Sequence, residues 1–252
     1  MLSKQNPLIG ILGGMGPAAT NDFIAKIIAA THARSDQDHF PLAVWSNPRI
    51  PDRNKAIFDP KRFPSPAPDL QYGARKLQDL GSDFIAIACN TAHHWHAEVQ
   101  AAVRIPVLHI ADVASVRLAA MGLGKGDGVG LLCTEGTRQS GYYDTRLKQF
   151  GLRVVYPDEA QQKRMMNVVY GIKRGELDAA RATILEIAGT LAAGKVRALL
   201  IACTELPIVL DGTSLPLPCI DATVCLADAC VATATAIQNS REVAKLPRKG
   251  PA

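Results

Sequence analysis

Short apolar runs alternate along the chain with longer stretches in which apolar positions recur at helical spacing. The runs are rich in β-branched residues and are bounded by glycine, proline or polar turns, which is typical of strands. The predicted strands are Leu8–Leu12, Leu42–Ser46, Asp83–Ala88, Val107–Ile110, Val129–Cys133, Arg153–Tyr156, Ala198–Ala202 and Pro218–Ile220. The predicted helices include Ala18–Ala33, Ala67–Leu80, Thr137–Phe150, Glu176–Ala193 and Ala222–Ile237. Because strands that are apolar throughout are buried on both faces, the pattern predicts an α/β protein with mostly parallel sheets flanked by helices.

An internal repeat divides the chain into two halves. Gly10–Gly16 aligns with Gly130–Gly136, and Ile85–Thr91 aligns with Leu199–Glu205 at a similar offset. Two repeated strand-turn-helix units predict two pseudo-symmetric α/β domains. We expect residues 1–112 together with 218–239 to form the first domain and residues 113–217 the second, with residues 240–252 as a disordered tail.

The loops that follow the predicted strands carry most of the chemically active side chains. In parallel α/β sheets, ligands bind beyond the carboxyl ends of the strands, where turns lead into helices. The turns Gly13–Gly16, Cys89–Thr91, Thr134–Thr137 and Cys203–Glu205 all occupy such positions. Two facing halves are therefore expected to form an active site in the cleft between the domains.

Composition and charge narrow the class of protein. The 252-residue chain is 48% apolar and 20% charged, with a formal charge of +5 and no block of five like charges, which argues against nucleic-acid or membrane-surface partners. The six cysteines form no CxxC pair, as expected of free thiols in a reducing cytosol. The N-terminal apolar run is too short for a signal peptide or a membrane span, so we expect a cytoplasmic protein.

The two repeated cysteines predict acid/base chemistry. Each of Cys89 and Cys203 ends an apolar run and precedes a threonine-bearing turn. A thiolate on one side of a carbon and a thiol on the other can invert that centre, and a following helix N-terminus favours the thiolate although a free cysteine has a pKa of about 8.5. A single cysteine here is more often a buried structural thiol, but the matched pair favours catalysis. Amides and side chains of Asn90, Thr91 and Thr204 could hold a substrate carboxylate.

Three motifs, Leu12–Pro17, Ala88–His93 and Ala202–Pro207, resemble those of the aspartate racemase branch of the aspartate/glutamate racemase superfamily. The similarity extends over nearly the whole chain, to about Ile237. The resemblance implies a cofactor-independent homodimer that interconverts the L and D forms of aspartate, or of glutamate, by a two-base mechanism and binds no metal. It assigns the two acid/base roles to Cys89 and Cys203.

The resemblance also implies a substrate-binding set. Arg53 resembles the family arginine that meets the distal carboxylate of an acidic substrate, and Lys173 resembles a lysine of the same pocket; without the resemblance, both would be interpreted as solvated side chains. The substrate-binding residues expected in all are Met15, Arg53, Asn90, Thr91, Ala92, Thr134, Lys173 and Thr204. Thr137 is either a further polar contact or a helix N-cap. Glu205 stands where the glutamate racemase branch has histidine, which favours the aspartate branch.

Other signals have simpler interpretations. His93, His94 and His96 lack further metal ligands at suitable spacing and are interpreted as a solvated helix face. The glycine-rich turn does not match a nucleotide-binding motif. Cys133 is interpreted mainly as a packing residue.

Several activities stay open at the level of sequence. A broad-specificity amino-acid racemase, a hydantoin racemase and a maleate cis-trans isomerase use related chemistry. An arylmalonate decarboxylase normally works with one cysteine, so the retained pair argues against it. A binding protein that has lost turnover is the non-enzymatic alternative.

Overall fold

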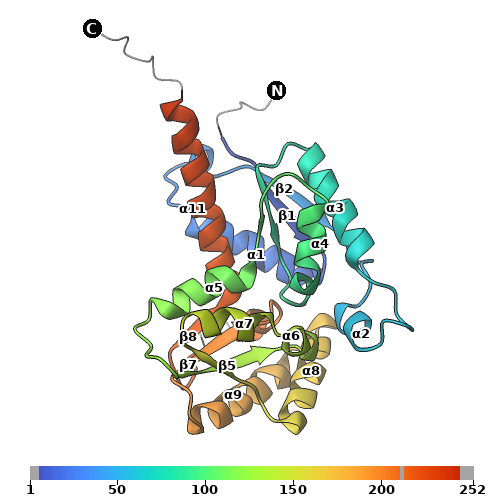
Figure 1. Cartoon of the computed structure of the whole chain (residues 1–252), viewed down its shortest axis with the longest axis vertical. Helices are drawn as coiled ribbons and strands as arrows, with labels where there is room; N and C mark the ends of the chain where they lie inside the picture. The colour runs from blue at the N-terminus through green and yellow to red at the C-terminus, as the bar shows by residue number, and fades with distance from the viewer. Residues whose placement is uncertain (1–5, 211–212, 245–252) are drawn as a thin grey trace.

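Two four-stranded parallel sheets form the centre of the molecule (Figure 1). The computed structural model describes residues 6–210 and 213–244. The first sheet has the order β2 (Leu42–Ser46), β1 (Ile9–Gly13), β3 (Phe84–Ile87), β4 (Val107–Leu108). The second has the order β6 (Arg153–Val155), β5 (Gly128–Cys133), β7 (Ala198–Ala202), β8 (Cys219–Asp221). All pairings are parallel, which confirms the predicted α/β fold with two like halves.

Helices cover both faces of each sheet. The first half contains α1 (Pro17–Ala30), α2 (Arg53–Phe58), α3 (Ala67–Asp79), the 3-10 helices η1 (Asp36–Asp38) and η2 (Thr91–Trp95), α4 (His96–Ala101) and α5 (Ile110–Ala119). The second half contains α6 (Glu135–Ser140), α7 (Tyr142–Gln149), α8 (Glu159–Lys173), α9 (Asp178–Ala193), α10 (Leu206–Leu210) and α11 (Ala222–Val243).

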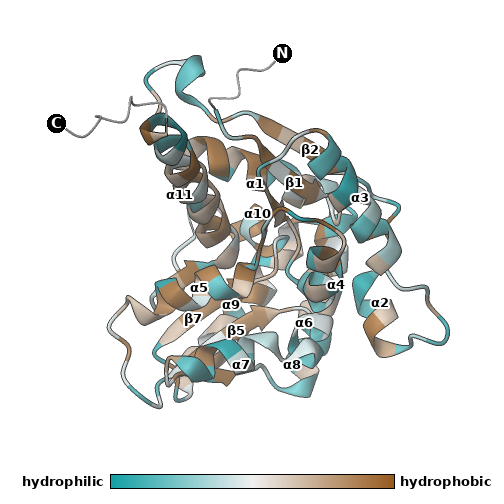
Figure 2. Ribbon diagram, turned by 45° about the horizontal axis from the view of Figure 1, so that its top comes forward, coloured by the Kyte–Doolittle hydropathy of each residue, from teal (hydrophilic) through white to brown (hydrophobic). Residues whose placement is uncertain are grey.

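Three apolar clusters hold these layers together. Leu70 and Leu77 of α3 pack on the outer face of the first sheet, and Ile184 and Ile187 of α9 pack on the outer face of the second. The third cluster joins the inner faces of both sheets to α1, α5, α7 and α11. Figure 2 shows the difference in composition, since α3 is largely hydrophilic while α5 and α11 carry hydrophobic residues along much of their length. The halves therefore share one continuous core.

The last helix crosses from the second half to the first. β8 pairs with β7 in the second sheet, and α11 then packs on α1 and α5 (Figure 1). An ion pair between Lys26 of α1 and Asp221 at the start of α11 reinforces this crossing. The sequence-based assignment of residues 218–239 to the first domain is therefore wrong for Cys219–Asp221, which belong to the second sheet.

Several predicted segments differ from the structure in their bounds. The helix predicted over Thr137–Phe150 is interrupted at Gly141, whose φ of 65° is left-handed and which separates α6 from α7. The strand predicted to end at Ile110 stops at Leu108, because Ile110 already begins α5. α11 extends to Val243, past the start of the predicted tail, and residues 245–252 lie outside the described residues. No helix in the described ranges is long and apolar enough to span a membrane.

Candidate active site at the junction of the two halves

The predicted turns meet where the two halves face each other. Cys89 stands two residues beyond the end of β3, and Cys203 directly follows β7. Across the junction, α6 contacts both α2 and η2. Both cysteine side chains are buried, with exposed fractions of 5% and 2%. The structure thus places each thiol in a protein interior rather than on a solvated loop.

The second half supplies the partners of Asn90. Its side-chain oxygen Oδ1 accepts a hydrogen bond of 2.7 Å from the hydroxyl of Tyr143, and its backbone carbonyl accepts one of 2.8 Å from Tyr142. The amide Nδ2 of Asn90 is buried and has no partner among the described residues. An unpaired buried donor is costly, so this group is suited to a ligand oxygen. It lies beside Cys89, where a carboxylate was predicted.

Three threonine hydroxyls form a second contact between the halves. The Oγ1 atom of Thr91 lies 2.8 Å from that of Thr134 and 3.2 Å from that of Thr137. The N-cap of α6 is Thr134, whose Oγ1 accepts a bond of 3.2 Å from the amide of Thr137. Thr137 is therefore a polar contact and not the cap. The two threonines predicted as substrate ligands, Thr91 and Thr134, are already bound to each other.

A carboxylate occupies the corresponding position beside Cys203. Glu205 is only 4% exposed. Its Oε2 lies 3.3 Å from the Sγ of Cys203 and 3.3 Å from the Oγ1 of Thr204, and its Oε1 accepts a bond of 3.0 Å from the amide of Gly16. Burial and the charge of Glu205 raise the pKa of the Cys203 thiol well above its usual value.

Lys173 lies at the end of α8, between the glycine turn and Glu205. Its Nζ forms an ion pair with Glu205 and donates a bond of 3.2 Å to the carbonyl of Met15. Burial alone would lower the Lys173 pKa, but the charges of Glu205 and Cys89 and the hydrogen bond to Glu205 outweigh it, so the pKa is raised. The ammonium interacts electrostatically with both Cys89 and Cys203. Lys173 therefore links the glycine turn of the first half to the carboxylate beside Cys203.

Arg53 faces the same glycine turn from the first half. It begins α2 rather than lying in a loop. Its guanidinium donates to the carbonyls of Ile50 and Pro51 at 3.1 and 2.9 Å and to that of Met15 at 3.2 Å, and its buried Nε has no partner. No carboxylate in the described part of the chain pairs with Arg53. Its positive charge is therefore available to an anion.

Met15 and Ala92 contribute differently from the polar residues. Both side chains are buried in the apolar cluster of the first sheet. The carbonyl of Met15 nevertheless accepts hydrogen bonds from both cations, Arg53 and Lys173. Met15 therefore fixes the separation of the cations through its backbone.

A cavity of about 630 Å³ opens beside this junction, between α2, α6 and α8. Phe58, Glu135 and Met166 line it, whereas neither predicted catalytic cysteine does. The predicted site residues instead bind one another across the junction. Carboxylates and a cation, Glu135, Glu159 and Lys163, also line this cavity, but it lacks the repeated thiols.

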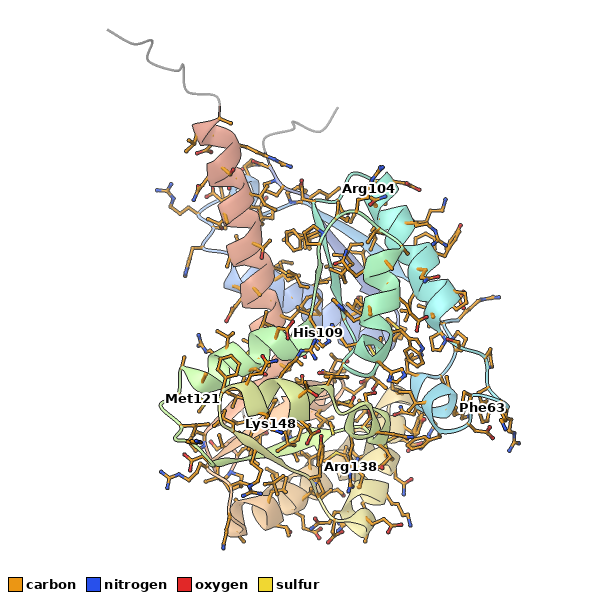
Figure 3. The ribbon with its side chains drawn as sticks, in the orientation of Figure 1. Phe63, Arg104, His109, Met121, Arg138 and Lys148 are labelled. Carbon is orange, nitrogen blue, oxygen red and sulfur yellow. The ribbon has the colours of Figure 1, made fainter. Side chains whose placement is uncertain are left out.

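The histidine interpretation is wrong for His93. His93 is buried, donates from Nδ1 to the carbonyl of Cys89 at 2.8 Å and accepts at Nε2 from the amide of Ile110 at 3.1 Å. Burial, with the nearby His96, lowers the pKa of His93 to about 3, so it is neutral at physiological pH. His109, which Figure 3 shows between the two halves where α5 begins, has its ring centroid 4.8 Å from that of His93, with the two rings tilted by 51°. His94 is exposed, as predicted.

His93 and the tyrosines of α7 support the cysteine turns but were not among the predicted site residues. His93 stands four residues after Cys89, a spacing that is visible in the sequence. Tyr142 and Tyr143 come from the other half, and no local pattern links them to Asn90. Cys133 lies in the shared core, where burial raises its pKa, in agreement with its interpretation as packing. No group of three or more His, Cys, Asp or Glu side chains in the described ranges is arranged to hold a metal ion.

Comparisons with known proteins agree with this arrangement. The family model described as Asp/Glu/Hydantoin racemase matches residues 12–230. The chain is 32% identical over 245 residues to the "Broad specificity amino-acid racemase RacX" of Bacillus subtilis (strain 168), covering 92% of this chain and 100% of that protein. The Picrophilus torridus aspartate racemase superposes with a TM-score of 0.81 at 35% identity, covering 91% of this chain and 94% of that one. A putative Asp/Glu racemase from Yersinia pestis superposes with a TM-score of 0.74 at 26% identity, covering 91% of this chain and 99% of that one. The chain belongs to the Asp/Glu/hydantoin racemase family of isomerases.

Proposed function

We propose that this protein racemises amino acids, with aspartate as its main substrate, by a two-base mechanism that uses Cys89 and Cys203. One observation carries the proposal: two buried thiols follow the equivalent strands β3 and β7 where the halves meet, and the second lies 3.3 Å from Glu205, the carboxylate that pairs with Lys173. A thiolate at one cysteine takes the α-proton, and the thiol of the other supplies a proton to the opposite face of the carbon. The net change is inversion, with no covalent intermediate.

The surrounding residues have complementary roles in this proposal. The unpaired amide of Asn90 and the nearby backbone amides receive the α-carboxylate, where they also stabilise the charge that develops on deprotonation. The hydroxyls of Thr91, Thr134 and Thr204 exchange their present partners for the carboxylate when it binds. The guanidinium of Arg53, which has no acidic partner in the described residues, receives the distal carboxylate in a bidentate way. Met15 and Ala92 line the site through backbone and apolar contacts.

A broader substrate range is the second candidate. Lys173 already pairs with Glu205, so of the two predicted cations it is Arg53 that offers an uncompensated charge to a side-chain carboxylate. When a substrate with a neutral side chain binds, Arg53 is left without an anionic partner, but Lys173 keeps its ion pair with Glu205. The name of the Bacillus relative, a broad specificity racemase, favours the same alternative.

The decisive experiment is incubation of the pure protein in deuterated water, without added cofactor, with L-aspartate, L-glutamate or L-alanine in separate reactions. Chiral chromatography with mass analysis follows the enantiomer and the α-deuterium together. We expect inversion with deuterium uptake, fastest for aspartate. Similar rates for all three would favour the broad-specificity candidate, and no exchange with any of them would contradict the proposal.

The resemblance also predicts a homodimer. Light scattering coupled to size-exclusion chromatography tests this, with a mass of twice 26.9 kDa expected.

A further inference from the structure

The two thiols have different polar partners. Cys203 lies 3.3 Å from a carboxylate oxygen of Glu205. No carboxylate in the described part of the chain hydrogen-bonds to Cys89, which interacts electrostatically with the ammonium of Lys173. Pseudo-symmetric strands therefore present two cysteines in electrostatically unequal surroundings.

The hydrogen bonds around Glu205 match the acceptor-only character of an ionised carboxylate. Four donors converge on its two oxygens: the Gly16 amide, the Lys173 ammonium, the Thr204 hydroxyl and the Cys203 thiol. An ionised carboxylate is an acceptor only, with about four lone-pair sites, so these donors satisfy it when it is charged. A charged Glu205 can accept from Cys203 only while that sulfur holds its proton. A thiolate there would place two negative charges 3.3 Å apart in a buried site.

We propose that Glu205 is a positioning residue that keeps the proton on Cys203, so that the resting protein carries its thiolate at Cys89. This inference rests on the two-base function proposed above, and it adds which thiol acts as the base and which as the acid in the resting form. In the resting form, the Cys89 thiolate accepts the α-proton and becomes a thiol. The Cys203 S–H proton passes to the opposite face of the carbon and leaves a thiolate. Proton exchange with solvent, gained at Cys203 and lost at Cys89, restores the resting form.

The other charges near the two cysteines also favour a thiolate at Cys89 over one at Cys203. Lys173 pairs with Glu205 and interacts electrostatically with both cysteines, and Arg53 donates to the same Met15 carbonyl as Lys173. At Cys203, the positive Lys173 is opposed by the negative Glu205. At Cys89, no hydrogen-bonded carboxylate in the described residues opposes it. The balance of charges therefore stabilises a thiolate at Cys89 more than at Cys203.

The test is to titrate each thiol directly by NMR of protein labelled with β-¹³C cysteine, with Cys89→Ser and Cys203→Ser used for assignment. We expect Cys89 to lose its proton at lower pH than Cys203. Glu205→Gln keeps the size of the side chain but removes its charge. It is expected to lower the pKa of Cys203 by about one unit or more, and by more than that of Cys89.

Glu135→Gln is the matched control, because Cys133-Thr134-Glu135 repeats the sequence Cys203-Thr204-Glu205. It should leave both titrations unchanged. A Cys203 that titrates below Cys89, or one whose pKa does not move in folded Glu205→Gln, would overturn the proposal. The order of the two thiols in the unsubstituted chain tests it even if the glutamine variant fails to fold. Because this titration needs no substrate, it is independent of whether racemisation is detected.

Discussion

The two cysteine turns lie on equivalent strands of like sheets, yet different chemistry completes each one. At the first turn, Asn90 and Thr91 are held by neutral hydroxyl groups, two of them from Tyr142 and Tyr143. At the second, Glu205 joins an ion pair with Lys173 and accepts from the amide of Gly16. In both cases some of the partners come from the opposite half. The fold supplies symmetric positions, and the contacts across the junction make them unequal.

The largest effect is expected from removing either thiol. Cys89→Ser and Cys203→Ser should each lower racemisation by about 10²- to 10⁴-fold, because a serine hydroxyl is a far weaker base and acid at neutral pH than the cysteine pair. Cys133→Ser, at a third strand end, is the control and should retain turnover. Chiral chromatography measures all three. A nearly active Cys89 or Cys203 variant would show that the two positions are not a functional pair.

Arg53, the cation of the first half, should affect the choice of substrate. Arg53→Ala is expected to lower the ratio of kcat/KM for aspartate to that for alanine by about 10- to 100-fold, since a charged hydrogen bond of about 1.5–3 kcal/mol is lost with the dicarboxylate alone. The ratio cancels any general loss of folded protein. Equal losses on both substrates would remove the distal-carboxylate role of Arg53.

Acid should destabilise the protein through histidines that lie in its first half. All six histidines precede Ile110. Burial, with the nearby His96, lowers the pKa of His93 to about 3, below its unfolded value of about 6.5. The neutral form therefore contributes stability above pH 6.5, and that stability is lost as the pH falls from 6.5 towards 3. We expect the free energy of unfolding to fall by about 1.4 kcal/mol per pH unit for this residue.

Urea unfolding at several pH values measures this slope. His93→Gln should flatten it, whereas His32→Gln, which changes an exposed side chain, should not. A slope unchanged in His93→Gln would mean that other groups cause the acid sensitivity.

The aligned glycines of the repeat should show the smallest difference. A Cβ atom on Gly136 would lie 2.7 Å from the Oδ1 of Asn54 and 2.9 Å from the Cγ2 of Thr91. Gly136→Ala should therefore lower stability by about 1 kcal/mol, after allowing for the gain from alanine in a helix. On Gly16, the nearest atom would be the Oε1 of Glu205 at 3.6 Å, so Gly16→Ala should change stability by less than about 0.5 kcal/mol. Thermal unfolding compares the two, and equal shifts would contradict the contact argument.

The sequence predicted the sheets and the cysteines because both leave local patterns. Apolar runs mark the strands, and the repeat marks the strand ends at Cys89 and Cys203. It did not predict the break at Gly141, because the flanking residues keep a helical pattern through it. The role of Tyr143 was hidden because its partner, Asn90, is distant in the chain. The burial of His93 was missed because short polar clusters are usually solvated, and only the packed fold shows its two hydrogen bonds.

The crossing of α11 onto the first half has a consequence for cleavage of the polypeptide. Gly122 and Gly126 lie in the exposed loop between α5 and β5, both with positive φ. A protease that cut there would sever the backbone between the sheets, yet α11 of the C-terminal fragment would still pack on α1 and α5 of the N-terminal fragment. The nicked protein should therefore elute as a single species under native conditions and separate into two fragments only in denaturant.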